Sequence, residues 1–240
     1  MRIRHHASLG LAATACLVLS GCTNAADWNA NRSSQIHSFD TSSIQAQPDI
    51  IAKLPQGALE DGVLDVAAST DYAPAEFLDP SGTAVGYDVD LTNAIAAVLG
   101  VKGKVHTAEF DSIIASIGSK YDAGISSFTV TPERTAEVDM TAYINVGSRF
   151  NVQAGNPKGV ETSDHLKLCG RTIGVQVGTA QETTMRDAAD KCAQAGKPVL
   201  SVRSYSKQSE ATTGLVGGTI DATYSDSTVA GYAVELTDGQ

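Results

Sequence analysis

The chain has 240 residues, of which 42% are hydrophobic, 18% are charged and only 5% are aromatic. This balance suits a chain that folds around a buried core and excludes a disordered tail. The formal net charge of -10 argues against nucleic acid, whose phosphates need a basic protein face. The sequence has no apolar run of the ~20 residues that a membrane-spanning helix needs, and its 4 cysteines are too few for a disulfide-framework miniprotein.

The first 21 residues have the pattern of a secretory signal peptide. Arg2 and Arg4 precede a short apolar stretch over residues 9–19, and small residues follow. The end of this segment, Leu19-Ser20-Gly21-Cys22, resembles the bacterial lipoprotein box, in which the cysteine becomes the acylated first residue. We therefore expect a signal peptide over residues 1–21 and palmitate-type lipidation at Cys22. The protein would then be extracytoplasmic and lipid-anchored to the bacterial cell membrane. The alternative is an ordinary signal peptide that contains a cysteine.

Residues 22–57 are rich in Asn, Ser, Gln, Ala and Asp and show no sustained hydrophobic period. This composition predicts a flexible tether between the lipid and a folded body. A small extra subdomain is the alternative.

Strands and helices are expected to alternate between residues 58 and 150. An apolar run predicts a strand over residues 63–68, alternation predicts one over residues 104–109, and a third is expected over residues 122–127. A first helix is predicted from Asp88 or Asp90 to Gly100, and a short second one from Asp111 to Gly118.

The same alternation returns between residues 151 and 240. Strands are predicted over residues 172–177, 198–204 and 220–225, and helices over residues 180–195, 209–216 and 227–236. Strands that alternate with helices indicate parallel sheets covered by helices. The sequence therefore predicts two α/β lobes, 58–150 and 151–240, with a candidate hinge over residues 148–153.

One motif carries a family resemblance. Gly86-Tyr87-Asp88-Val89-Asp90-Leu91 resembles the signature of the bacterial extracellular solute-binding proteins of family 3, the amino-acid receptors of ABC importers. Further motifs in the matching order are Tyr72-Ala73-Pro74, Glu109-Phe110-Asp111, Ser126-Ser127-Phe128-Thr129 with Arg134, residues 178–182, and Ile220-Asp221-Ala222 with Asp226. The resemblance spans about residues 59–236.

The resemblance implies a type II periplasmic-binding-protein-like fold, in which two α/β lobes close on a ligand about a hinge. The family normally returns to lobe 1 after lobe 2. This chain ends at Gln240, about where that return should begin, so a C-terminally truncated lobe 1 is expected.

A free amino acid needs a fixed cation for its carboxylate and a fixed anion for its ammonium group. The resemblance assigns the carboxylate to Arg134, whose guanidinium can make two parallel hydrogen bonds. A surface arginine paired with Glu133 or Glu137 is the alternative. The ammonium group is assigned to Asp226, at the end of a strand, where open α/β sheets bind ligands. Its alternative role is the N-cap of the helix that follows.

Other ligand contacts are implied by the resemblance alone. Ser127 and Thr129 would donate to the ligand, although such hydroxyls also bond local backbone. Thr179 and Ala180 lie at a helix start, whose free amides suit a carboxylate. Tyr72 and Phe110 would sandwich the ligand side chain, or else pack in the core.

The residues expected to read the ligand side chain are polar. Ser69 stands where some receptors for basic amino acids carry an acid, which argues against lysine or arginine, although Asp71 could substitute. Gln176 and Gln181 could read an amide or a carboxylate. The preferred ligand on this ground is a polar amino acid such as glutamate or glutamine.

Cys169 and Cys192 remain after Cys16 leaves with the signal peptide and Cys22 takes the lipid. An oxidised pair is the natural state outside the cytoplasm, so a disulfide is expected. Two free thiols are the alternative.

An enzyme on the same fold, of the dehydratase or peptidoglycan-cleaving type, is the main competing function. We expect no catalytic residues, no metal and no cofactor, because no zinc-protease, redox, serine-hydrolase or Walker motif occurs. A sensor ectodomain would need a membrane-spanning segment. The expected partners are a free amino acid, a membrane permease pair with its cytoplasmic ATPase, and the membrane through the lipid. No nucleic acid is expected, and the protein is expected to be a monomer.

Overall fold

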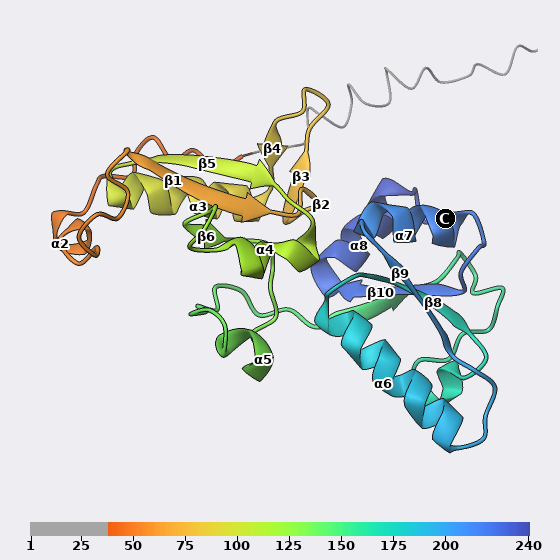
Figure 1. Ribbon diagram of the computed structural model, residues 1–240. Helices are drawn as coiled ribbons and strands as arrows, with labels where there is room; N and C mark the ends of the chain where they lie inside the picture. The colour runs from red at the N-terminus through yellow and green to blue at the C-terminus, as the bar shows by residue number, and fades with distance from the viewer. Residues whose placement is uncertain (1–37) are drawn as a thin grey trace, which may run out of the picture. The chain divides into compact units, whose positions relative to one another are not determined.

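The computed structural model describes residues 38–240 (Figure 1). The expected signal peptide, Cys22 and the first part of the expected tether lie outside the described residues. Among residues 38–240, no helix combines the length and apolar character that crossing a bilayer requires.

Lobe 1 is built on a parallel sheet in the order β5-β1-β6. Its strands are β1 (Val63–Ala68), β5 (Lys102–Thr107) and β6 (Ala123–Gly124), and its helices are α3 (Tyr87–Leu99) and α4 (Phe110–Ser116). A small antiparallel sheet follows β1 and consists of β2 (Asp71–Tyr72), β3 (Glu76–Leu78) and β4 (Ala84–Val85). Helix α3 runs along β5 and β1 (Figure 1).

Helix α3 follows the sequence prediction closely. It ends at Gly100, whose φ of 71° is left-handed, a conformation that favours glycine at a helix C-terminus. Asp88 and Asp90 lie in the first turn, where the helix dipole stabilises negative charge.

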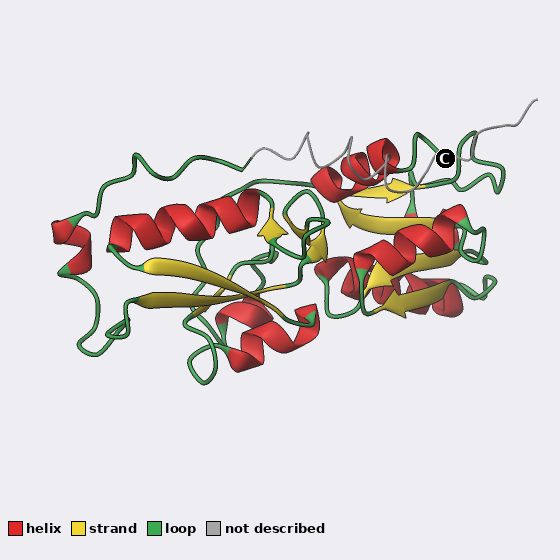
Figure 2. Ribbon diagram, turned by 90° about the horizontal axis from the view of Figure 1, so that it is seen from above, coloured by secondary structure: helices red, strands yellow, loops and turns green. Residues whose placement is uncertain are grey.

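Lobe 2 has a mixed sheet in the order β7-β10-β8-β9. Its strands are β7 (Ser148–Asn151), β8 (Thr172–Gln176), β9 (Ser201–Tyr205) and β10 (Ala222–Asp226). Its helices are a 3-10 turn η1 (His165–Leu168), α6 (Ala180–Gln194), α7 (Gln208–Val216) and α8 (Ser227–Leu236). Helices lie on both sides of this sheet (Figure 2). Strands β10, β8 and β9 are mutually parallel, as the alternation of strands and helices predicts.

The core of lobe 2 is the largest hydrophobic cluster of the described residues. Ile173, Val175 and Met185 are fully buried in it. Cys192 of α6 is also fully buried there and forms a disulfide with Cys169, with a Cα–Cα distance of 5.6 Å. This bond ties α6 to the loop that precedes β8.

Two segments differ from the predicted domain plan. Residues 38–57, expected to be tether, include helix α2 (Pro48–Ile51), and the amide of Gln47 donates to the carbonyl of Val98 in α3. Ser148–Asn151, expected to be hinge, forms β7 and pairs antiparallel with β10. The change of lobe therefore falls before Ser148, in the largely irregular residues 125–147 that contain the short helix α5 (Pro132–Thr135). Periodicity could not locate it, because neither segment has a sustained pattern.

Candidate functional site

A small cavity lies between lobe 1 and lobe 2. Its lining consists of Tyr72, Phe110, Ser127, Thr129, Arg134, Thr179, Ala180, Gln181 and Asp226. All of these residues belong to the set predicted from the sequence. They come from the ends of β2 and β10, the starts of α4 and α6, and the segment that links the lobes.

Arg134 spans the two lobes. Its guanidinium donates to the carbonyl of Thr129 at 2.7 Å and to the carbonyl of Gly178 in lobe 2 at 2.8 Å. The group lies over the rings of Phe110 and Phe128, at 5.5 and 5.2 Å from their centroids. Among the ion pairs of the described residues, none joins Arg134 to Glu133 or Glu137. The side chain lines the cavity, and among the described residues it forms no ion pair with its acidic neighbours in the sequence.

Asp226 is 5% exposed and lies at the end of β10. It occupies the N-cap position of α8, but its side chain makes no capping hydrogen bond. Instead, Gln181 donates to Asp226 Oδ1 at 2.8 Å, and the Asp226 amide donates to the Tyr72 hydroxyl at 3.2 Å. Burial raises the pKa of Asp226, while the bonds from Gln181 and Tyr72 and the charge of Arg134 oppose that rise. The carboxyl group is thus held in place by Gln181, and it makes no hydrogen bond to the amides of the helix that follows.

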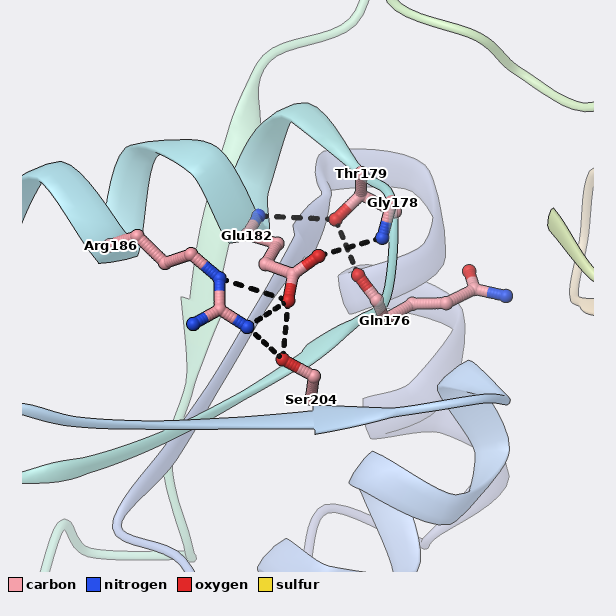
Figure 3. Close-up of polar contacts among 6 residues, drawn as sticks. All are labelled: Gln176, Gly178, Thr179, Glu182, Arg186 and Ser204. Carbon is pink, nitrogen blue, oxygen red and sulfur yellow. Dashed lines mark hydrogen bonds and ion pairs between the residues drawn. The ribbon is translucent and has the colours of Figure 1, made fainter. Parts of the chain in front are cut away.

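The start of α6 is fixed by a network of side chains (Figure 3). Thr179 is the N-cap, and its hydroxyl accepts from the amide of Glu182 at 3.1 Å. Glu182 in turn accepts from the amide of Gly178 at 2.7 Å and from Arg186. These bonds fix the first turn of α6, where unpaired amides of the helix suit an anion.

The charge state of Glu182 follows from this network. Burial alone would raise its pKa, but hydrogen bonds from Ser204, the Gly178 amide and Arg186 outweigh burial and lower it. Sequence reasoning did not single out Glu182, although Thr179 and Glu182 have the spacing of a capping box, which would have found it.

Ser69 and Gln176, also predicted as ligand contacts, do not line the small cavity. They lie beside it and bond each other across the lobes, Gln176 Nε2 donating to Ser69 Oγ at 3.1 Å. Ser69 also donates to Asp71 Oδ1 at 2.9 Å. Around them, three buried acceptor oxygens have no hydrogen-bond partner: Asp71 Oδ2, Gln176 Oε1 and Gln208 Oε1. The sequence did not predict Gln208 as a site residue, because no motif distinguishes this first residue of α7.

The aromatic residues form one wall of the site. Phe110 stacks on Phe128 with ring centroids 4.5 Å apart, and Tyr72 is 5% exposed. The sequence did not identify Phe128 as a site residue, because only the hydroxyl residues beside it in the motif were predicted to contact the ligand. Within residues 38–240, no group of three or more His, Cys, Asp or Glu side chains could hold a metal ion.

Two α/β lobes around a cavity at their junction define the class of two-lobed periplasmic-binding-protein folds. The model of the bacterial extracellular solute-binding proteins, family 3, matches residues 64–236. The chain belongs to this family.

Particular relatives agree with that assignment. The chain is 31% identical over 237 residues to the arginine-binding protein ArgT of Corynebacterium glutamicum, covering 98% of this chain and 75% of the relative. An ancestral arginine-binding protein bound to glutamine has a similar structure, with a TM-score of 0.65 and 34% identity over 73% of this chain and 74% of that one. The ancestral amino acid-binding protein AncCDT-1, described as a precursor of cyclohexadienyl dehydratase, has a TM-score of 0.67 and 31% identity over 75% of this chain and 76% of its own.

Proposed function

We propose that this protein is an extracytoplasmic receptor that binds a free amino acid between its lobes and delivers it to an ABC importer. The observation that carries the proposal is one cavity that brings Arg134, Asp226 and the start of α6 together. A cation, an anion and free helix amides in one small space match the two charged groups of a zwitterion.

The carboxylate of the ligand would be bound from both lobes, and its ammonium group from lobe 2. The carboxylate would bind Arg134, reached from lobe 1, and the amides at the N-terminus of α6 in lobe 2. The ammonium group would bind Asp226, which Gln181 already holds in position. Because the ligand contacts both lobes, its binding would favour the closed arrangement.

The side chain of the ligand is proposed to carry several hydrogen-bond donors. Asp71, Gln176 and Gln208 present unpartnered acceptor oxygens at the edge of the site, and a guanidinium or ammonium group would satisfy them. ArgT, a relative of this chain, is named an arginine-binding protein. Glutamate or glutamine, the preference from the sequence, is the competing ligand, and one ancestral relative was solved with glutamine. Gln181 supports this preference less, because its amide already bonds Asp226 and Ser148.

The place of action is proposed from the N-terminal sequence. Lipidation at Cys22 would hold the receptor on the outer face of the cell membrane, next to the permease that it serves. We propose that the receptor acts as a monomer.

A dehydratase-type enzyme is the second candidate, because AncCDT-1 is described as the precursor of one. The two functions differ in whether the bound molecule changes.

Calorimetry of the purified protein with arginine, lysine, glutamine and glutamate tests the proposal, followed by chromatography of each mixture for new products. We expect saturable binding, tightest for arginine, and full recovery of the ligand. A matched pair of arginine analogues, agmatine without the carboxylate and 5-guanidinopentanoate without the amine, should bind more weakly than arginine. Absence of binding across the panel, or turnover of a bound compound, would contradict the receptor.

A further inference from the structure

Two acidic side chains are buried behind the lobe 1 wall of the cavity. Glu76 of β3 is 0% exposed and Asp88 of α3 is 1% exposed. An isolated buried carboxylate is strongly disfavoured, so a close pair of carboxyl groups needs a specific explanation.

One carboxyl oxygen of each acid accepts hydrogen bonds from a serine of the loop after β6. Ser126 donates through its hydroxyl to Glu76 Oε1. Ser127 donates twice to Asp88 Oδ2, through its amide at 2.9 Å and its hydroxyl at 3.1 Å. The Tyr143 hydroxyl also hydrogen-bonds Asp88.

The second oxygen of each acid is buried and has no such partner. These atoms are Glu76 Oε2 and Asp88 Oδ1. The two side chains are themselves within hydrogen-bonding contact of each other. Two bare carboxylates cannot bond, whereas one proton between the two remaining oxygens satisfies both.

We propose that Glu76 and Asp88 share one proton, and that this protonated pair is the positioning element that holds Ser126 and Ser127 in the wall of the ligand cavity. Ser127 lines the cavity with a φ of 46°, a left-handed conformation that a serine adopts only when its surroundings hold it there. Ser126 also accepts from the amide of Ser69, so the pair supports a second loop beside the site.

The surroundings favour retention of the proton. Burial, followed by the charge of Asp88, raises the pKa of Glu76 well above its usual range, and burial raises the pKa of Asp88. The titratable groups that face the pair are Asp71 and Tyr72 of β2, Tyr87 of α3, Tyr143 and, from lobe 2, Asp226. All five are acids, so loss of the proton would add negative charge to an already acidic environment.

Amide substitutions test the shared proton. In Glu76→Gln, the carbonyl still accepts from Ser126 and the amide nitrogen supplies a permanent donor to Asp88. In Asp88→Asn, the carbonyl still accepts from Ser127 and the nitrogen donates to Glu76. The double variant keeps both serine bonds but makes two donors face each other.

Thermal unfolding of the ligand-free protein between neutral and alkaline pH provides the first measurement. The wild type should lose stability as the pH rises, because the unfolded acids release the proton that the folded pair retains. Both single variants should lack this decline and fold as well as the wild type at neutral pH. The double variant should be less stable than either, and its affinity for arginine should fall about tenfold or more, because buried donors are left unpaired. Asp90→Asn, on the same helix, is the matched control and should keep the wild-type pH profile.

An infrared readout separates a shared proton from a merely structural role. The wild type at neutral pH should show a carboxylic acid carbonyl band that both single variants lack and Asp90→Asn keeps. The affinity measurement depends on the proposed amino-acid binding, but the unfolding and infrared measurements do not, so failure of one proposal is distinguishable from failure of the other. Single variants as damaging as the double variant, or a band that survives in both, would overturn the shared proton.

Discussion

The roles of Arg134 and Asp226 depend on the residues that surround each side chain in the folded protein. From sequence alone, an exposed arginine and a helix cap explain these two residues as well as ligand contacts do. The structure places both on one cavity, with Arg134 over two phenylalanine rings and Asp226 free of any capping bond. The residue types could be predicted from the sequence, but the partners of the two side chains could not, because those depend on contacts between distant segments.

Substitution of Asp226 tests its role. Asp226→Asn removes the negative charge and keeps the shape, so arginine binding should weaken by about tenfold to a hundredfold, the range for a hydrogen bond to a charged group. Binding of 5-guanidinopentanoate, which has no ammonium group, should change by much less. Calorimetry with both ligands measures the difference, and equal losses would argue against this role.

At the scale of elements, the helices were predictable where a capping residue, a helical spacing of apolar residues and a helix-ending residue indicate the same bounds. Helix α3 begins one residue before Asp88 and ends at Gly100, and α8 spans Ser227–Leu236 as expected. Strand β6 is only Ala123–Gly124 and pairs with β1, so it is shorter than the strand predicted over residues 122–127. The segment before Ser148 has no period to read, which is why the hinge was placed too late in the chain.

The network at the start of α6 should affect stability as a function of pH. The pKa of Glu182 is lowered in the folded state, so its contribution is present above the usual value of 4.5 and is lost as the pH falls below it. Glu182→Gln should therefore destabilise the protein by about 1–3 kcal/mol at neutral pH, through lost hydrogen bonds of a charged group. The difference in free energy of unfolding between Glu182→Gln and the wild type should become smaller at acidic pH.

Urea denaturation at a series of pH values measures this effect. Asp187→Asn, an exposed acid on the same helix, is the control and should follow the wild type. If the difference in free energy of unfolding stayed constant at acidic pH, the charge of Glu182 would have no role in stability.

At the scale of the whole molecule, the two-lobed plan followed from the repeated alternation of strands and helices. The sequence could not give the way the lobes meet. That junction depends on pairs such as Ser69 with Gln176, which are 107 residues apart and hydrogen-bond from one lobe to the other beside the cavity.

The disulfide offers a test at this scale. It closes a loop of sequence separation 23 within lobe 2, and cross-linking a loop of that length adds roughly 3 kcal/mol by restricting the unfolded chain. The double variant Cys169→Ala with Cys192→Ala should unfold at a clearly lower temperature, with ligand affinity nearly unchanged because neither residue lines the cavity. Calorimetric scanning measures the first quantity and titration the second. An unchanged unfolding temperature would mean that the bond does not stabilise the fold.

Gly178 gives the junction of the lobes a further property. A methyl group at its Cα would lie 2.8 Å from Cβ of Asp111 and 3.1 Å from its Cα, and its φ of 76° is one that larger residues resist. The backbone of Gly178 in lobe 2 thus packs directly against Asp111 of lobe 1, and any side chain at residue 178 would push the two lobes apart. The missing side chain at residue 178 therefore allows the two lobes to approach closely at this point, and Gly178→Ala should hinder that approach.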